Sequence, residues 1–188
     1  TYASFNNFHK ISDDTIDVWS KILNNSNSQI LLKNSMSPNT VGEELKLNLL
    51  KKFMTRGVEK NKILFIEHKK NFEDHLRSYN NVDLALDTFP YPGVTTTFEA
   101  VLMGVPVLTM KGHNFNSRCG ESININLEME NFIVENKDDY FNKAMSFQKE
   151  KNVLKNVGKN LREKVLKSPL FDMKSFAKSF EKIIQKII

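Results

Sequence analysis

Short apolar runs alternate with amphipathic segments over roughly the first 110 residues, and this alternation restricts the possible folds more than any other feature. The apolar runs predict strands at residues 1–6, 29–33, 62–66, 82–86 and 106–109. The segments between them predict helices that begin after Ser12, span 41–56 with Gly57 as the stop, span 72–79, and run from Thr95 to Gly104. Strands that alternate with helices indicate an α/β fold with a doubly wound, Rossmann-like parallel sheet, in which ligands bind at the carboxyl ends of the strands.

Beyond about residue 135 the sequence shows only helical patterns. Residues 138–150 and 151–167 predict two helices, and the Ser168-Pro169 pair ends the second one. A third helical pattern carries an apolar stripe made of Met173, Phe176, Phe180, Ile183 and Ile187. We expect this stripe to pack on the sheet. The alternative is a partner-binding helix whose far end docks on something outside this chain.

The bulk properties suit a single domain over residues 1–188, with the sheet in about 1–110 and a mostly helical part in about 135–188. No apolar run approaches the ~20 residues of a membrane span, and no basic-then-apolar leader is visible, so we expect no membrane contact and no signal peptide. The single cysteine, Cys119, cannot form an internal disulfide, which makes a reducing, cytoplasmic location the expectation.

The formal net charge of +5 raises the question of nucleic-acid binding. The lysines are spread along the chain among acidic residues, and no arginine-rich stripe occurs. We therefore expect no nucleic-acid partner, and a basic nucleic-acid-binding domain remains a third hypothesis, which salt-sensitive binding to oligonucleotides would support.

The stretch most informative about function covers residues 86–100, a strand end followed by a turn with proline and glycine and then a helix that opens on three threonines. A helix N-terminus has unpaired N–H groups and about half a positive charge, so it is suited to bind a phosphate. Gly93 lets the backbone approach a ligand, and Thr95 and Thr96 add hydroxyl donors. Glu99 lies one turn further on, where it can accept hydrogen bonds from a ribose. The stretch indicates a nucleotide diphosphate site; the alternative is an ordinary capped helix that binds nothing.

Three other strand ends carry polar residues that face the same edge of the predicted sheet. After the first strand, Lys10 is suited to neutralise a pyrophosphate and Asn7 to offer an amide to phosphate oxygens, unless the lysine simply faces solvent. After the third strand, His75 can stack on or hydrogen-bond a base, or be a surface histidine. Residues 111–118 follow the fifth strand and can contact a sugar, although they fit an ordinary loop equally well.

No pattern indicates a metal site or a hydrolase nucleophile. Neither an i, i+4 pair nor Cys–His spacing occurs among His9, His68, His75 and His113. The aspartate pairs at 13–14 and 138–139 are typical of helix starts, and no GxSxG or Walker A motif is present. We therefore expect no metal and no cofactor.

Five segments, in order along the chain, are similar to those of one known family: residues 5–11, 75–79, 86–100, 103–107 and 168–171. The block Asp-Thr-Phe-Pro-Tyr, Thr-Thr-Thr, Met-Gly-Val-Pro-Val is the most specific of them. Together they resemble the bacterial branch of the protein O-linked N-acetylglucosamine transferase / SPINDLY family over the whole chain. The resemblance implies the two-lobed GT-B glycosyltransferase fold, of which this chain looks like the C-terminal, nucleotide-sugar-binding lobe.

The resemblance also implies a reaction and a role for each candidate residue. The family transfers a hexose or N-acetylhexosamine to protein Ser or Thr hydroxyls with inversion, from a nucleotide sugar and without a metal; for this chain a UDP-sugar is expected rather than a GDP-sugar. By the resemblance, the donor is held by Asn7 near the phosphates, Lys10 at the diphosphate and leaving group, His75 at the base, Thr95 and Thr96 at the diphosphate, and Glu99 at the ribose.

Some positions depart from the animal enzymes, which carry a histidine at Val94, an arginine at Ser78, a glutamine at Asn7 and an aspartate at Glu99. The N-terminal lobe, with a histidine proposed to help activate the acceptor, and the tetratricopeptide repeats have no counterpart in this sequence. We therefore expect a separate catalytic lobe and an acceptor protein as partners, and little or no transfer by this chain alone. The alternative is a freestanding or degenerate nucleotide-binding regulatory module without transfer activity.

Overall fold

The computed structural model describes residues 1–33, 40–67 and 69–187. Its described strands form a six-stranded sheet in the order β3-β2-β1-β4-β5-β6, and every neighbouring pair is parallel. The strands are β1 (Tyr2–Ser4), β2 (Ile30–Lys33), β3 (Ile63–Ile66), β4 (Leu84–Leu86), β5 (Val107–Met110) and β6 (Ile133–Val134). This confirms the predicted doubly wound, Rossmann-like fold. Because the direction of winding reverses between β1 and β4, the ligand crevice of such a sheet lies outside the carboxyl ends of these two strands.

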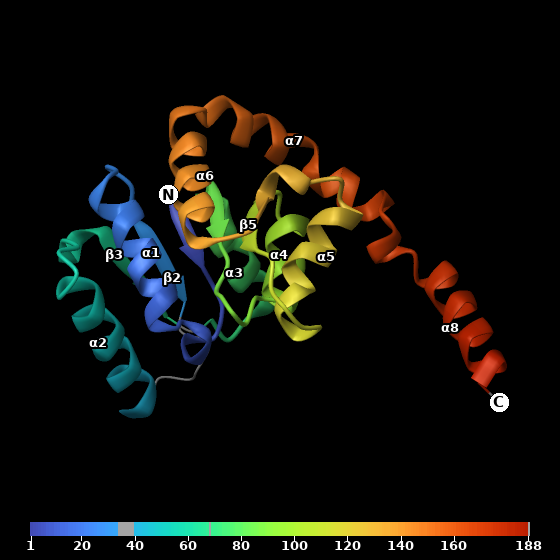
Figure 1. Cartoon of the computed structure of the whole chain (residues 1–188). Helices are drawn as coiled ribbons and strands as arrows, with labels where there is room; N and C mark the ends of the chain where they lie inside the picture. The colour runs from blue at the N-terminus through green and yellow to red at the C-terminus, as the bar shows by residue number, and fades with distance from the viewer. Residues whose placement is uncertain (34–39, 68, 188) are drawn as a thin grey trace.

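Helices cover both faces of the sheet (Figure 1). They are α1 (Asp13–Asn24), α2 (Thr40–Met54), α3 (Phe72–Arg77), α4 (Thr95–Leu102), α5 (Cys119–Asn126), α6 (Lys137–Lys149), α7 (Lys151–Lys167) and α8 (Met173–Ile187). Helix α1 contacts α2 and α6 on one face, whereas α4 contacts α5 on the other, as right-handed crossovers require. Helix α7 contacts both α6 and α4, and so joins the two layers at one end of the sheet.

The local signals that bound the predicted helices act as expected. The Ser12 hydroxyl accepts a hydrogen bond from the Thr15 N–H at 3.1 Å and caps α1. Helix α2 ends at Met54, and Gly57 adopts a φ of 81°, a left-handed conformation that favours glycine. The five predicted strands are all present, most of them shorter than their apolar runs.

Apart from short 3-10 turns, one described helix and one described strand were not predicted, α5 and β6. The sequence of α5 alternates apolar and polar residues around Ile123 and Ile125, so it lacks the helical period. Tertiary packing determines its conformation: Asn124 is fully buried, and its Nδ2 donates to the Val107 carbonyl at 2.9 Å. Strand β6 has only two residues, too few for a sequence pattern to identify.

The C-terminal helix does not pack on the sheet, contrary to our expectation. Figure 1 shows α8 projecting away from the body of the molecule beyond α7. None of its residues from Met173 to Ile187 is buried, and Phe176 on its apolar stripe is 64% exposed. The helix is amphipathic as predicted, but its apolar stripe is exposed and is not buried against the sheet.

In the described ranges, no helix combines the length and the apolar character that crossing a bilayer would require.

Candidate functional site

The loops that follow β1 and β4 meet at the point where the winding reverses. Strand β1 pairs with β4 through Ala3 and Ala85, so the chain leaves both strands at the same edge of the sheet. Lys10 lies in the first loop, and its Nζ donates to the Pro92 carbonyl at 2.9 Å. The same Nζ lies 4.1 Å from the centroid of the Tyr91 ring. The Lys10 ammonium is therefore positioned beside the turn that leads into α4.

Helix α4 begins without a side-chain cap. Val94 occupies the N-cap position, and the first intrahelical bond runs from the Phe98 N–H to the Val94 carbonyl at 3.0 Å. The N–H groups of Thr95, Thr96 and Thr97 meet no acceptor in the part of the chain that the structure describes. These N–H groups and the helix dipole give this end of α4 a partial positive charge, close to Lys10.

A buried carboxylate organises the turn between β4 and α4. Asp87 is 2% exposed, and its Oδ1 accepts hydrogen bonds from the Gly93 N–H at 2.7 Å, the Thr88 N–H at 3.0 Å and Asn6 Nδ2 at 2.9 Å. Its Oδ2 accepts from the Thr109 hydroxyl at 2.9 Å. Burial raises the pKa of Asp87, and these hydrogen bonds oppose that rise. Asp87 thus ties the turn to the loop after β1 and to β5.

The surroundings of Gly93 explain why glycine is needed there. A Cβ at this position would lie 2.5 Å from the Thr96 hydroxyl and 2.6 Å from Asn6 Oδ1, far inside contact distance. The Thr96 hydroxyl itself donates to Asn6 Oδ1. The sequence suggested that Gly93 admits a ligand, and the structure adds an internal reason, the crowding of side chains around the turn.

The predicted base and ribose residues lie side by side. His75 Nε2 and Glu99 Oε2 are 2.8 Å apart, and the two side chains are 14% and 15% exposed. The Tyr79 hydroxyl donates to the same Glu99 oxygen at 3.3 Å and to the Thr96 carbonyl at 3.2 Å. Burial and the Glu99 charge both raise the pKa of Tyr79, so its hydroxyl keeps its proton and acts as a donor. The structure therefore brings His75, Glu99 and the α4 N-terminus into one site.

Lys33 belongs to this cluster, and our sequence interpretation missed it. It is the last residue of β2, it is 6% exposed, and its Nζ contacts His75 Nδ1. Burial lowers the pKa of Lys33, while the Glu99 carboxylate raises it. The available signal was a charged residue at the carboxyl end of an otherwise apolar strand.

Asn7 and Thr95 lie at the exposed edge of the site. The Asn7 Oδ1 accepts a hydrogen bond from the His9 N–H at 3.0 Å and caps a single helical turn, Phe8–Lys10. Both side chains face solvent, so they are accessible to a ligand. In this structure Asn7 also has a local structural role, because its cap fixes the turn that carries Lys10.

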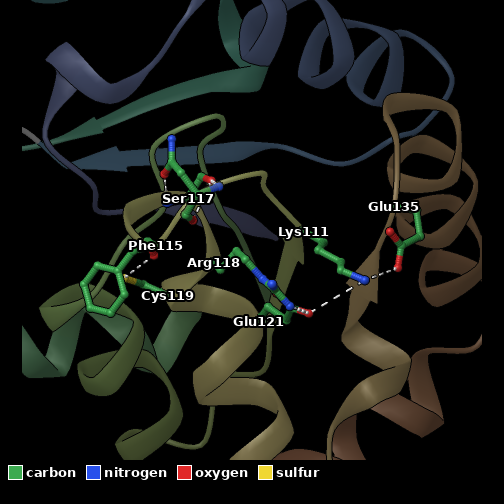
Figure 2. A network of polar contacts seen from close by, with 8 residues as sticks. Lys111, Phe115, Ser117, Arg118, Cys119, Glu121 and Glu135 are labelled. Carbon is green, nitrogen blue, oxygen red and sulfur yellow. Dashed lines mark hydrogen bonds and ion pairs between the residues drawn. The ribbon is translucent and has the colours of Figure 1, made fainter.

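The charged residues of the loop after β5 pair with Glu121 of α5 and with Glu135, which follows β6 (Figure 2). Arg118 donates to both Glu121 oxygens, at 2.6 and 3.0 Å, and this contact lowers the pKa of Glu121. Lys111 lies 3.9 Å from Glu121 and 3.3 Å from Glu135. The loop over residues 111–118 is therefore held by ion pairs, and its predicted contact with a sugar remains a prediction.

Within the described ranges, no group of three His, Cys, Asp or Glu side chains is arranged to hold a metal ion. His68, one of the four histidines considered above, lies outside the described residues. The aspartates at 13–14 and 138–139 are in the first turns of α1 and α6, as predicted.

These features define a doubly wound α/β protein whose candidate site lies where the strand order reverses. The model of the family "Glycosyl transferase family 41" matches residues 1–180. The chain belongs to this family, which confirms the predicted membership.

Two curated relatives are named as SPINDLY glycosyltransferases. Over 177 residues the chain is 34% identical to a probable UDP-N-acetylglucosamine–peptide N-acetylglucosaminyltransferase SPINDLY of Eustoma exaltatum subsp. russellianum. Over 178 residues it is 33% identical to the protein of the same name from Solanum lycopersicum. Each match covers 94% of this chain and 19% of the relative, so the chain spans about a fifth of the length of these relatives.

Solved structures agree with the fold. A mutant O-GlcNAc transferase from Thermobaculum terrenum superimposes with a TM-score of 0.88 at 26% identity, over 98% of this chain and 35% of that one. A glycosyltransferase from Rickettsia africae shares the fold, with a TM-score of 0.66 at 15% identity over 99% of this chain and 47% of that one.

Proposed function

We propose that this chain is the nucleotide-sugar-binding lobe of an inverting glycosyltransferase that modifies Ser and Thr hydroxyls of proteins, with a UDP-sugar as the donor. One observation carries the proposal: Lys10 and the uncapped N-terminus of α4 converge at the switch point of the sheet. Membership of family 41 supports it, and the curated relatives are named for transfer of N-acetylglucosamine from its UDP derivative to peptides.

The chemistry assigned to this lobe is stabilisation of the leaving group. In an inverting transfer, the acceptor oxygen attacks the anomeric carbon, and the bond from that carbon to the diphosphate oxygen breaks. The electron pair stays on the diphosphate, which gains negative charge. The Lys10 ammonium and the N–H groups of Thr95, Thr96 and Thr97 would hold that charge, and preorganised donors of this kind stabilise it without a metal ion.

The nucleoside would bind beside the diphosphate, over His75 and Glu99. Both hydrogen bonds that Glu99 accepts end on Oε2, and Oε1 accepts none in the described part of the chain. Oε1 is therefore suited to accept a ribose hydroxyl, with Asn7 and Thr95 at the exposed edge near the phosphates. The base would lie against the His75 ring, whose two nitrogens contact Lys33 and Glu99.

Transfer would need a second lobe, which supplies the acceptor side of the active site. The curated relatives are about five times as long as the segment they share with this chain, which leaves room for that lobe and for repeats that recruit acceptor proteins. By this proposal the chain alone binds the donor nucleotide in the cytoplasm and transfers sugar poorly or not at all.

A calorimetric titration with UDP, GDP and ADP, without added metal, tests the proposal. We expect selective UDP binding, weakened by Lys10→Ala. Lys21→Ala is the matched control, because Lys21 also lies over an aromatic ring, Phe141 at 4.4 Å, but sits in the last turn of α1. A preference for GDP would overturn the assigned base. If neither this chain nor a longer protein that includes the second lobe binds a nucleotide, the degenerate module is favoured. The exposed Val94 at the N-cap of α4 also supports that alternative.

A further inference from the structure

A buried lysine touches the side of His75 that faces away from Glu99. Lys33 ends β2 and is 6% exposed, and its Nζ contacts His75 Nδ1. The opposite nitrogen of the ring, Nε2, lies 2.8 Å from Glu99 Oε2. The imidazole therefore bridges a buried amino group and a carboxylate that come from β2 and α4, two elements far apart in the sequence.

The chemistry of the three groups fixes the direction of the hydrogen bonds. An ammonium has three donors and no acceptor, so the Nδ1 atom that faces Lys33 must present its lone pair. The proton of the neutral imidazole is then on Nε2, where it donates to Glu99. The chain of donors runs from Lys33 through His75 to Glu99.

We propose that Lys33 is a positioning residue, which holds His75 as the Nε2–H tautomer and so keeps Glu99 oriented with Oε1 toward the ribose of a bound nucleotide. The ribose contact rests on the proposed function, whereas the tautomer does not. The Tyr79 hydroxyl adds a second donor to Oε2, at 3.3 Å, so both internal bonds of Glu99 use the same oxygen. The other oxygen is left for the ligand.

Packing holds the imidazole in this position. Its ring centroid lies 5.9 Å from those of Phe72 and Tyr79 and 6.3 Å from that of Phe5. The titratable groups that face it are Lys33 from β2, Glu99 from α4 and Tyr79 from the helical turn Ser78–Asn81. Lys69 acts on this cluster through its charge interaction with Lys33.

Removal of the Lys33 charge would change the state of His75. With only Glu99 beside it, the imidazole gains a second proton more readily, because a nearby carboxylate favours the charged ring and the repulsion from Lys33 is gone. An imidazolium would bind Glu99 Oε2 more strongly and draw the negative charge of the carboxylate toward that oxygen, so Oε1 would become a weaker acceptor for the ribose hydroxyls. Nucleotide binding by the Lys33 variant would then weaken as the pH falls.

The test combines a spectroscopic and a binding measurement on the same variants. Nitrogen-15 NMR of histidine-labelled protein reports which ring nitrogen of His75 carries the proton. In Lys33→Met, which preserves side-chain length, we expect double protonation at a pH at least about one unit higher than in the unaltered chain. Lys33→Arg should restore the tautomer, because a guanidinium also donates and does not accept.

Lys62→Met is the matched control. Lys62 is another partly buried lysine, whose Nζ donates to the Leu23 and Ser26 carbonyls at 2.8 and 2.9 Å, next to the start of β3 and thus at the opposite edge of the sheet. This variant loses similar contacts without approaching His75. We expect it to leave both the NMR signals of His75 and the affinity for UDP unchanged.

In the binding arm, Lys33→Met should lower the UDP affinity about tenfold at pH 6 and less at pH 8, with Lys33→Arg close to the unaltered chain. A proton on Nδ1 in the unaltered chain, or identical NMR titrations with and without Lys33, would overturn the assignment. An unchanged UDP affinity in Lys33→Met would overturn the positioning role. If the unaltered chain binds no UDP, the proposed function fails, and the NMR titration alone decides whether Lys33 sets the tautomer.

Discussion

Asp87 is the residue whose replacement should most affect the turn that forms the candidate site. Its carboxylate accepts hydrogen bonds from four donors: the Gly93 and Thr88 N–H groups, Asn6 Nδ2 and the Thr109 hydroxyl. All four lie in a region from which water is excluded, since Asp87 is 2% exposed. Asp87→Ala leaves every one of these donors without its acceptor.

The expected loss follows from the number of orphaned donors. A buried donor left unpaired costs about 1–3 kcal/mol. Asp87→Ala also removes a buried carboxylate, and the desolvation cost that is no longer paid offsets part of this loss. We take the lower limit for each of the four donors, which gives a decrease in the free energy of unfolding of about 4 kcal/mol. Asp87→Asn is the matched control: its carbonyl oxygen can still accept from Gly93 and Thr88, so we expect it to lose less than half as much.

A comparison of the unaltered chain with Asp87→Asn also tests how Asp87 affects stability as the pH changes. Burial raises the pKa of Asp87 above its ordinary value of 3.8, so the folded chain holds this proton at pH values where the unfolded chain has released it. The contribution of Asp87 to stability is therefore complete below pH 3.8 and decreases as the pH rises through the folded-state pKa. Asparagine does not titrate, so the stability of the unaltered chain relative to Asp87→Asn should fall with rising pH over this range.

Urea denaturation followed by far-UV circular dichroism, at several pH values from 3.5 upward, measures both effects. A loss below about 1 kcal/mol for Asp87→Ala would show that the turn does not depend on these bonds. A relative stability that increases with pH would refute the argument that burial dominates the electrostatics of Asp87.

Three further substitutions separate binding from stability. Lys10→Ala, in a protein that also carries the second lobe, should abolish sugar transfer but change the free energy of unfolding by less than about 1 kcal/mol, the value of its cation–π contact; normal transfer rates would exclude Lys10 from the reaction. Glu99→Ala should weaken UDP binding by about 1–3 kcal/mol in calorimetry, and an unchanged affinity would argue against the ribose contact. Gly93→Ala should cost about 1–3 kcal/mol in urea denaturation, because its Cβ would lie 2.5 Å from the Thr96 hydroxyl; a stable variant would show that the turn relaxes.

The sequence predicted most of the fold because its signals are local. The period of the apolar residues identified the five strands, and the caps at Ser12 and Gly57 bounded two of the helices. Helix α5 escaped prediction because its structure depends on distant partners: buried Asn124 bonds to the carbonyl of Val107 on β5. The position of α8 was also wrong, because an amphipathic stripe shows that a helix has an apolar face but not what that face contacts.

The candidate site divides in the same way. By itself the sequence determined which residues follow each strand, and therefore that Lys10, His75 and the threonines of α4 share one edge of the sheet, since parallel strands all end there. Only the tertiary structure decided that His75 bonds to Glu99, that the Lys33 amino group contacts His75 Nδ1, and that Asp87 is a buried acceptor. These contacts depend on strand order and helix packing, which bring together side chains that no sequence period relates.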